Sequence, residues 1–326
     1  MTDIQSTTAG YFPRPDYIIE TLKDVEGYQK HDLDAEAEKE VEDEFTKGRE
    51  EVLTIQEDAG IDLPAEGQLS WDDILAFPAT RIEGIEMGGI VRFYDNNRFY
   101  RQPQIQDSID FDGEITLEQY RSAEELADGT VKPVMAGPYS LARLSKNHQY
   151  DSEKDVVEAF AEVVNRELRN LVDEGAETIQ LDEPSLTGVN EEGVNVDAAV
   201  TGIDRALEDV DADVIIQTYF GDIADAYGSL LEVADGVGLD LVEGKEENLK
   251  AVEEYGAPEV LSAGVMNSRN TRMETAEGIE EEVEEVLDAG QPSTLHVGPN
   301  AGLDFLPWTV MKEKVEVLGT AIQEVK

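Results

Sequence analysis

The chain has 326 residues and a formal net charge of −49, from 74 acidic and 25 basic side chains, and it contains no cysteine. Such a charge excludes nucleic acid as an expected partner, because the phosphate backbone would be repelled. The absence of cysteine excludes disulfides, thiolate metal ligands and cysteine nucleophiles supplied by this chain. Apolar residues make up 40% of the sequence and occur in periodic runs, which argues against an acidic disordered chain.

The acidic excess instead predicts a protein of a halophilic cytosol. At molar salt the Debye length falls to roughly 3 Å, which screens self-repulsion while a carboxylate-rich surface stays hydrated. The first residues, MTDIQSTTAGYF, lack the basic and apolar regions of a signal peptide. No stretch approaches ~18 consecutive apolar residues, so we expect a cytoplasmic protein that does not span a membrane.

Eight short apolar runs alternate with helix-patterned segments along the chain. They are residues 9–13, 84–94, 131–138, 178–184, 214–220, 237–242, 260–267 and 294–300. Strands that alternate with helices form βαβ crossovers and a parallel sheet. Eight such units predict an α/β fold, a (β/α)8 TIM barrel, whose active face consists of the strand C-termini and the loops that follow them.

Helical periodicity is clearest over residues 152–174, before Gly175. A strongly charged stretch over about residues 32–60 predicts one long surface helix, as part of an N-terminal helical extension. Two ordinary domains would also fit the length. However, no Pro-, Ser- or Gly-rich linker divides the chain, so we assign residues 1–326 to a single barrel domain.

Acidic residues occur where two predicted strands end or are buried. Asp182 and Glu183, followed by Pro184, end the fourth run, where a carboxylate would hold a substrate ammonium group or share a proton; the structural alternative is a cap for the next loop. Asp240 lies inside an apolar run, and a buried carboxylate is costly unless it is paired or binds a ligand. A site role and structural pairing both remain open for Asp240.

Two further segments carry polar side chains after predicted strands. Residues 92–101 alternate aromatics with amides and arginines, a pattern that fits a substrate-facing loop and a twisted hairpin equally well. Arg269 and Arg272 follow the seventh run, where they would attract an anionic group or bridge to the many acids. The histidines show no HxH, HxxxH or HxxE spacing and therefore predict no zinc site.

Several motifs, in this order, resemble the cobalamin-independent methionine synthase family, whose enzymes are two similar barrels in tandem. Residues 8–14 (TAGYFPR) are similar to its TTxGSFPR, residues 132–138 and 144–146 (KPVMAGP, LSK) to KPVxxGPxT…LSK, and residues 179–184 (IQLDEP) to IQxDEPxL. Residues 93–100, 218–221 and 261–270 resemble WFDTNYHY, TTYFG and LSLGVVNGRN of the N-terminal barrel, and residues 300–303 resemble NPDCGL of the C-terminal one. The resemblance covers most of the chain and implies a single barrel closer to the N-terminal one.

The resemblance also implies a substrate site at the mouth of the barrel. The backbone of Ala9, Gly10 and Tyr11 would hold an amino acid, and Asp182 would bind an ammonium group or a pterin donor. Folate or its acidic tail would contact Tyr94, Asn96 and Arg98. The other residues assigned to substrate binding are Arg14, Glu183, Tyr219, Asp240, Asn267 and Arg269.

The zinc ligands of the family are not matched. Its catalytic barrel uses a His-x-Cys after strand five, a Glu after strand six and a Cys near the end, where this chain has Gln217, Tyr219, Asp240 and Ala301. The family's proton-transferring histidine corresponds to Asn267. Without thiolates and that histidine, homocysteine sulfur cannot be activated in the family's way, so we assign no catalytic residue and no cofactor bound by this chain.

The resemblance therefore implies a methionine-synthase-type barrel that acts in methyl transfer from a methylfolate or methylcorrinoid donor to homocysteine, together with a separate zinc-bearing barrel. Two alternatives remain open. The chain would be a non-catalytic scaffold subunit that binds folate or a corrinoid protein, or a related barrel that acts on another substrate, as a decarboxylase or thiol methyltransferase.

Overall fold

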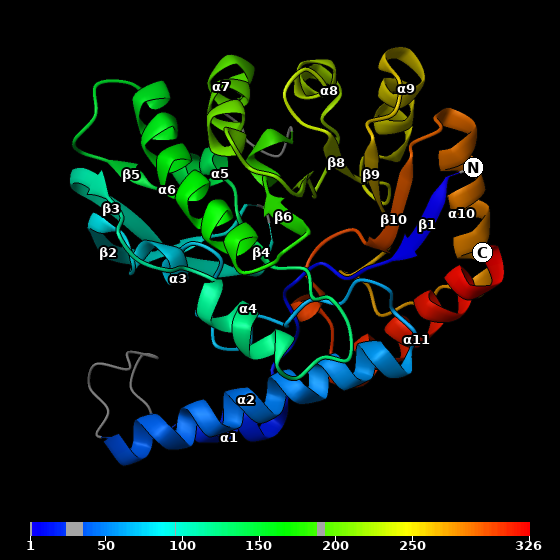
Figure 1. Ribbon diagram of the computed structural model, residues 1–326, viewed down its shortest axis with the longest axis horizontal. Helices are drawn as coiled ribbons and strands as arrows, with labels where there is room; N and C mark the ends of the chain where they lie inside the picture. The colour runs from blue at the N-terminus through cyan, green and yellow to red at the C-terminus, as the bar shows by residue number, and fades with distance from the viewer. Residues whose placement is uncertain (1, 24–34, 95, 188–192) are drawn as a thin grey trace.

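The computed structural model describes residues 2–23, 35–94, 96–187 and 193–326 (Figure 1). Its main sheet has seven strands, all paired in parallel, in the order β1-β10-β9-β8-β7-β6-β4. These strands are β1 (Asp3–Ser6), β4 (Val134–Ala136), β6 (Thr178–Asp182), β7 (Asp213–Gln217), β8 (Gly236–Asp240), β9 (Val260–Met266) and β10 (Thr294–Pro299). Parallel strands covered on both faces read as continuous apolar runs, which is why six of the predicted runs overlap with these strands.

An irregular segment, residues 61–68, closes the barrel between β1 and β4. Thr7 forms an isolated parallel bridge with Leu63, whose backbone N–H donates to the Ser6 carbonyl at 3.0 Å. On the other side, the Lys132 N–H donates to the Pro64 carbonyl at 2.8 Å. Pro64 has no N–H to donate, so this segment cannot complete a regular ladder. The fold is a TIM barrel in which this irregular segment takes the place of a strand.

Two of the eight predicted runs are not barrel strands. The first barrel strand is β1, and residues 9–13 follow it as an irregular segment in which Gly10 has a φ of +87°. Residues 84–94 fall largely in β2 (Glu83–Arg92), which pairs antiparallel with β3 (Phe99–Asp110) outside the main sheet. The short strand β5 (Lys146–Asn147) joins the other edge of β3. This antiparallel pairing confirms the hairpin interpretation of residues 92–101. Alternating apolar and polar residues suit such a ribbon, because one of its faces is solvated.

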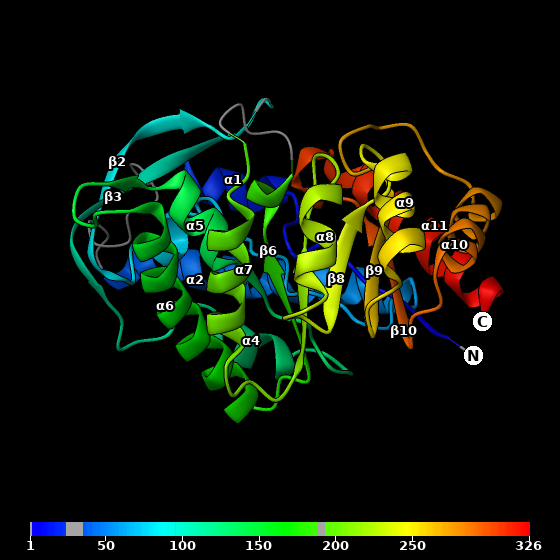
Figure 2. The same ribbon diagram turned by 90° about the horizontal axis from the view of Figure 1, so that it is seen from above.

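Helices cover the barrel from outside. Figures 1 and 2 show α6, α7, α8 and α9 side by side around strands β6 to β9. The helices are α1 (Asp16–Leu22), α2 (Ala35–Asp58), α3 (Ala76–Ala79), α4 (Leu117–Glu124), α5 (Pro138–Leu144), α6 (Glu153–Asp173), α7 (Val196–Leu207), α8 (Ala224–Leu230), α9 (Lys245–Tyr255), α10 (Ala276–Ala289) and α11 (Trp308–Val325). Two short 3-10 turns, η3 (Pro184–Leu186) and η4 (Leu303–Phe305), follow β6 and β10.

The two helices predicted most clearly are observed. A capping box between Ser152 and Asp155 begins α6, and Gly175, with a φ of +107°, follows its end. The long charged helix is α2, observed over residues 35–58; residues 32–34 of the prediction lie outside the described part. Within that part, no helix has both the length and the apolar character that a membrane span requires.

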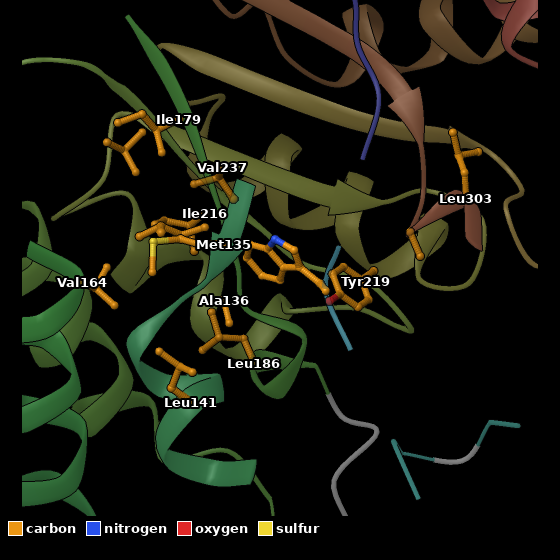
Figure 3. Close-up of a cluster of buried hydrophobic side chains, with 14 of the residues drawn as sticks. Met135, Ala136, Leu141, Val164, Ile179, Leu186, Ile216, Tyr219, Val237 and Leu303 are labelled. Carbon is orange, nitrogen blue, oxygen red and sulfur yellow. The ribbon is translucent and has the colours of Figure 1, made fainter. Parts of the chain in front are cut away.

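Buried apolar side chains fix the positions of the strands. Figure 3 shows Met135, Ile179, Ile216 and Val237, from the neighbouring strands β4, β6, β7 and β8, gathered in one cluster. Each of these side chains is essentially inaccessible to solvent. The cluster holds the strands in register, and the register determines which side chains meet at their C-terminal ends.

Candidate functional site

A cavity of about 610 Å³ opens at the C-terminal ends of the barrel strands. Its walls come from Asp182 at the end of β6, from the segments that follow β1, β7 and β10, from the β2–β3 hairpin and from the segment before α3. This is the face at which TIM-barrel enzymes bind their substrates. The predicted site residues that line it are Ala9, Tyr11, Arg14, Arg98, Asp182 and Tyr219.

Asp182 is the buried acid of the cavity floor. Its Oδ1 accepts a hydrogen bond from Nε2 of Gln180 at 2.7 Å, and the Tyr219 hydroxyl is a second partner. Burial raises the pKa of Asp182 to about 7, whereas these hydrogen bonds and the buried ammonium group of Lys132 oppose the shift. A carboxylate in this position can bind an ammonium or amide N–H group of a ligand.

Tyr11 and Arg14, which also line the cavity, hydrogen-bond to the segment before α3. The Tyr11 hydroxyl donates to the Trp71 carbonyl at 3.1 Å, and Nη2 of Arg14 donates to the same oxygen at 2.5 Å. Nε of Arg14 donates to the Leu69 carbonyl at 2.7 Å. Burial raises the pKa of Tyr11 far above its usual range, so its hydroxyl stays neutral. Both side chains thus hold the segment before α3 in place.

Arg98 reaches the cavity from the hairpin and forms an ion pair with Asp304 of η4, with Nη2 and Oδ2 3.1 Å apart. The same guanidinium also donates to the Asp304 carbonyl and lies over the Phe305 ring, 4.9 Å from its centroid. Burial raises the pKa of Asp304 to about 6, and the charge of Arg98 opposes this shift. Sequence reasoning missed Asp304, although it is an acid between the apolar residues Leu303 and Phe305, in the segment that follows the last strand.

Phe220 is the centre of an aromatic cluster at the cavity wall. Its ring makes edge contacts with those of Phe93, Tyr94, Tyr219 and Phe305 at centroid distances between 4.7 and 6.1 Å. Such pairs add stability beyond the area that they bury. The arrangement was not predicted, because these rings come from three separate segments and only the fold brings them together.

Other predicted site residues lie behind the cavity lining. The Tyr94 hydroxyl shares a hydrogen bond of 2.7 Å with Oγ of Ser185, and Asn96 Oδ1 accepts from the Arg98 N–H at 2.7 Å. Gly10 packs against Val134, whose side chain lies 2.9 Å from where a β-carbon of Gly10 would be. These residues support the mouth of the barrel rather than line its cavity.

Glu183 caps helix α5. Its two carboxylate oxygens accept the backbone N–H groups of Tyr139 and Ser140 at 2.8 and 2.7 Å, and its side chain is fully buried. Burial raises its pKa to about 7. The alternative for the Asp182–Glu183 pair was a cap for the loop that follows the strand; Glu183 is a cap, but of helix α5, which precedes β6 in the chain.

Asn267 and Arg269 are also held by protein groups. Asn267 Oδ1 accepts the Arg269 N–H at 2.9 Å, and its carbonyl accepts from the buried Lys314 at 2.7 Å. The Arg269 guanidinium forms an ion pair of 2.6 Å with Glu243 and lies over the Phe220 ring. The bridge to an acid, one of the two readings of this arginine, is thus present.

The side chains at the family's zinc positions do not fit a zinc site. Gln217 Oε1 accepts from the Ser262 hydroxyl at 2.8 Å, and its Nε2 donates to the Thr218 carbonyl at 3.1 Å. The Asp240 carboxylate is surrounded by backbone N–H donors, Tyr219 bonds Asp182, and Ala301 offers no donor atom. Among the residues that the structure describes, no group of three or more His, Cys, Asp or Glu side chains is arranged to hold a metal ion.

Comparisons with known proteins agree with the motifs. A family model described as "Cobalamin-independent synthase, N-terminal domain" matches residues 80–290. The methionine synthase of Saccharolobus solfataricus is 26% identical over 314 residues, which cover 96% of this chain and 92% of that protein, and the one of Sulfurisphaera tokodaii is 27% identical over 325 residues, which cover 98% and 92%.

A solved structure shares the fold. The B12-independent methionine synthase of Shewanella sp. W3-18-1, in complex with selenomethionine, superposes with a TM-score of 0.82 at 18% identity, covering 98% of this chain and 97% of that one. The family model spans well over half of the sequence, and the fold agrees with it. The chain therefore belongs to the cobalamin-independent methionine synthase family, as a methionine-synthase-type barrel.

Proposed function

We propose that this barrel binds homocysteine and takes part in methyl transfer to it from a methylfolate or methylcorrinoid donor, in the cytoplasm and with a zinc-bearing barrel as partner. The observation that carries the proposal is the cavity at the strand C-termini, with Asp182 at its floor, in a chain of this family. An amino acid presents an ammonium group to such a carboxylate. The Shewanella barrel, which was solved with selenomethionine, supports an amino-acid ligand for this fold.

The need for a partner follows from the chemistry of the thiol. A free thiol has a pKa of about 8.5, so only a few per cent is thiolate at neutral pH. None of the described residues that line the cavity is a histidine or cysteine, and the side chains at the zinc positions are engaged with protein groups. These observations support binding by this chain and activation of the sulfur by groups that a second barrel supplies.

A second candidate function is a scaffold subunit that binds folate or a corrinoid protein without catalysis. It is favoured by the way the Asp240 carboxylate is used, because its hydrogen-bonding capacity goes to the protein itself. The two functions differ in one outcome: a scaffold would bind a donor but no homocysteine.

Isothermal titration calorimetry in molar KCl tests the proposal. Homocysteine and methyltetrahydrofolate are titrated into the unmodified chain, into Asp182→Asn and into Asp235→Asn, an exposed aspartate that precedes β8 at the other end of the strand. We expect homocysteine binding that Asp182→Asn weakens at least about tenfold, because a charge-assisted hydrogen bond is lost, and that Asp235→Asn leaves unchanged. Donor binding without homocysteine binding would favour the scaffold, and no binding of either would contradict both functions.

A further inference from the structure

A chain of hydrogen-bonded side chains runs from the cavity floor into the barrel interior. Lys132, only 1% exposed, donates from Nζ to Oε1 of Gln180 at 2.5 Å, and Gln180 in turn donates from Nε2 to Asp182 at 2.7 Å. Gln180 and Asp182 are two residues apart on β6 and therefore face the same side of the sheet. Lys132 approaches them from the segment just before β4.

We propose that Lys132 is a positioning residue, which orients the Gln180 amide and thereby fixes the direction and the charge of the Asp182 carboxylate at the cavity. The inference rests on the proposed function, because it takes Asp182 as the group that meets the ligand. Lys132 itself does not line the cavity, so its effect on a ligand is indirect.

The orientation of Gln180 follows from the donor and acceptor inventory of the chain. An ammonium group has donors only, so the Gln180 amide can present only its oxygen to Lys132. Its NH2 group is then left for Asp182, as observed. Without the lysine, the amide is free to turn its oxygen toward Asp182, and the carboxylate would lose its donor and face a repulsive oxygen. One buried cation thus sets the polarity of the whole chain of contacts.

The charges of Lys132 and its neighbours support the same role for this lysine. Burial lowers the pKa of Lys132 to about 7 and raises that of Asp182 to about 7, while the attraction between the two groups opposes both shifts. The other titratable groups near this pair are Tyr219, Glu183 and His296. Burial and the charge of Lys132 lower the pKa of His296 to about 4, so it adds no positive charge at neutral pH. Lys132 is therefore the cation that favours the ionised form of Asp182.

The test is a direct titration of Asp182 in the ligand-free protein by carboxyl carbon-13 NMR, in molar KCl, with its resonance identified by its loss in Asp182→Asn. Three further variants are compared: Lys132→Met, which keeps the length of the side chain without its charge; Gln180→Met, which breaks the chain but keeps Lys132; and Lys250→Met, an exposed lysine on α9. We expect the midpoint of Asp182 to rise by about one pH unit or more in Lys132→Met and in Gln180→Met, and to stay unchanged in Lys250→Met.

Homocysteine binding is measured on the same samples across pH. The acidic limb of the pH profile of homocysteine binding should move to higher pH together with the Asp182 midpoint. A simple loss of packing would not produce this shift. If Lys132→Met does not fold, Gln180→Met decides the question. An unchanged midpoint in a folded variant that still binds homocysteine would overturn the role of Lys132 and leave the proposed function intact. A shifted midpoint in a protein that binds no homocysteine would keep the role of Lys132 and contradict the proposed function.

Discussion

The carboxylate of Asp240 accepts the backbone N–H of Phe220 at 2.8 Å and thereby ties the end of β8 to the loop after β7. Phe220 has a φ of +77°, a left-handed conformation that costs a residue with a β-carbon about 1–3 kcal/mol. The other oxygen of Asp240 accepts the N–H groups of Val242 and Glu243, both at 2.9 Å. One acid at a family zinc position thus holds two loops at the mouth of the barrel.

Replacing Asp240 should destabilise the fold. We expect Asp240→Ala to lower the free energy of unfolding by about 3 kcal/mol, because three backbone N–H groups lose a charged acceptor in a buried site. Asp240→Asn keeps one acceptor oxygen and should cost less. Urea unfolding in molar KCl measures both, with Asp235→Asn as the exposed control. Equal stability of Asp240→Ala and the control would show that the carboxylate is not a structural anchor.

The pH dependence of stability should reveal Glu183. Its pKa is raised by burial from 4.5 to about 7, so the folded protein holds this proton more tightly than the unfolded chain does. This contribution to stability is present below about pH 4.5 and is lost as the pH rises through about 7. As the pH rises between these values, the stability of Glu183→Gln should therefore rise relative to that of the unmodified protein, by about 3–4 kcal/mol over the whole range.

Urea unfolding at several pH values in this range measures the difference. Glu253→Gln, at an exposed glutamate of α9, is the matched control and should run parallel to the unmodified protein. Parallel curves for Glu183→Gln as well would mean that Glu183 titrates in the folded protein as it does in the unfolded chain.

Stability should rise steeply with KCl. At a net charge of −49, self-repulsion is the dominant long-range contribution, and raising the salt from 0.1 to 1 M shortens the Debye length from about 10 to about 3 Å. We expect the thermal midpoint to increase throughout this range. A midpoint independent of KCl would remove the argument for a halophilic cytosol.

The isolated chain should bind little zinc. Gln217, Tyr219 and Ala301 supply neither imidazole nor thiolate, and Asp240 alone is too weak a ligand to retain the ion. Metal analysis of protein purified without chelators should find well below one zinc per chain. Stoichiometric zinc coordinated near Asp240 would show that the correspondence with the family's ligand positions is mistaken.

Six barrel strands could be predicted from the sequence because their residues are buried on both faces, as in Val260–Met266. The first strand could not, since Asp3–Ser6 has only four residues and few of them are apolar. The segment that closes the barrel escaped prediction because Pro64 and Gly67 mark it as a loop, and only its pairing with β1 and Lys132 shows its place.

The site shows the same division. Asp182 could be placed at the cavity because strand ends of a barrel converge on one face. Tyr11 and Arg98 were placed there by the resemblance of residues 8–14 and 93–100 to motifs of the family. Lys132 could not be predicted as an interior group, because a lysine beside a proline ordinarily marks a solvated strand entry. Its burial depends on Gln180, and that contact exists only after the barrel has formed.

The most direct measurement is methionine formation from homocysteine in high salt, with methylfolate or methylcorrinoid donors, by the purified chain alone and together with a zinc-bearing paralogue. The account predicts negligible turnover by the chain alone, turnover with the partner, and a marked loss of that turnover in Asp182→Asn. Robust turnover by the chain alone would contradict the need for a partner. No turnover with any donor when the partner is present, and no binding of homocysteine, would contradict the proposed role in methionine synthesis.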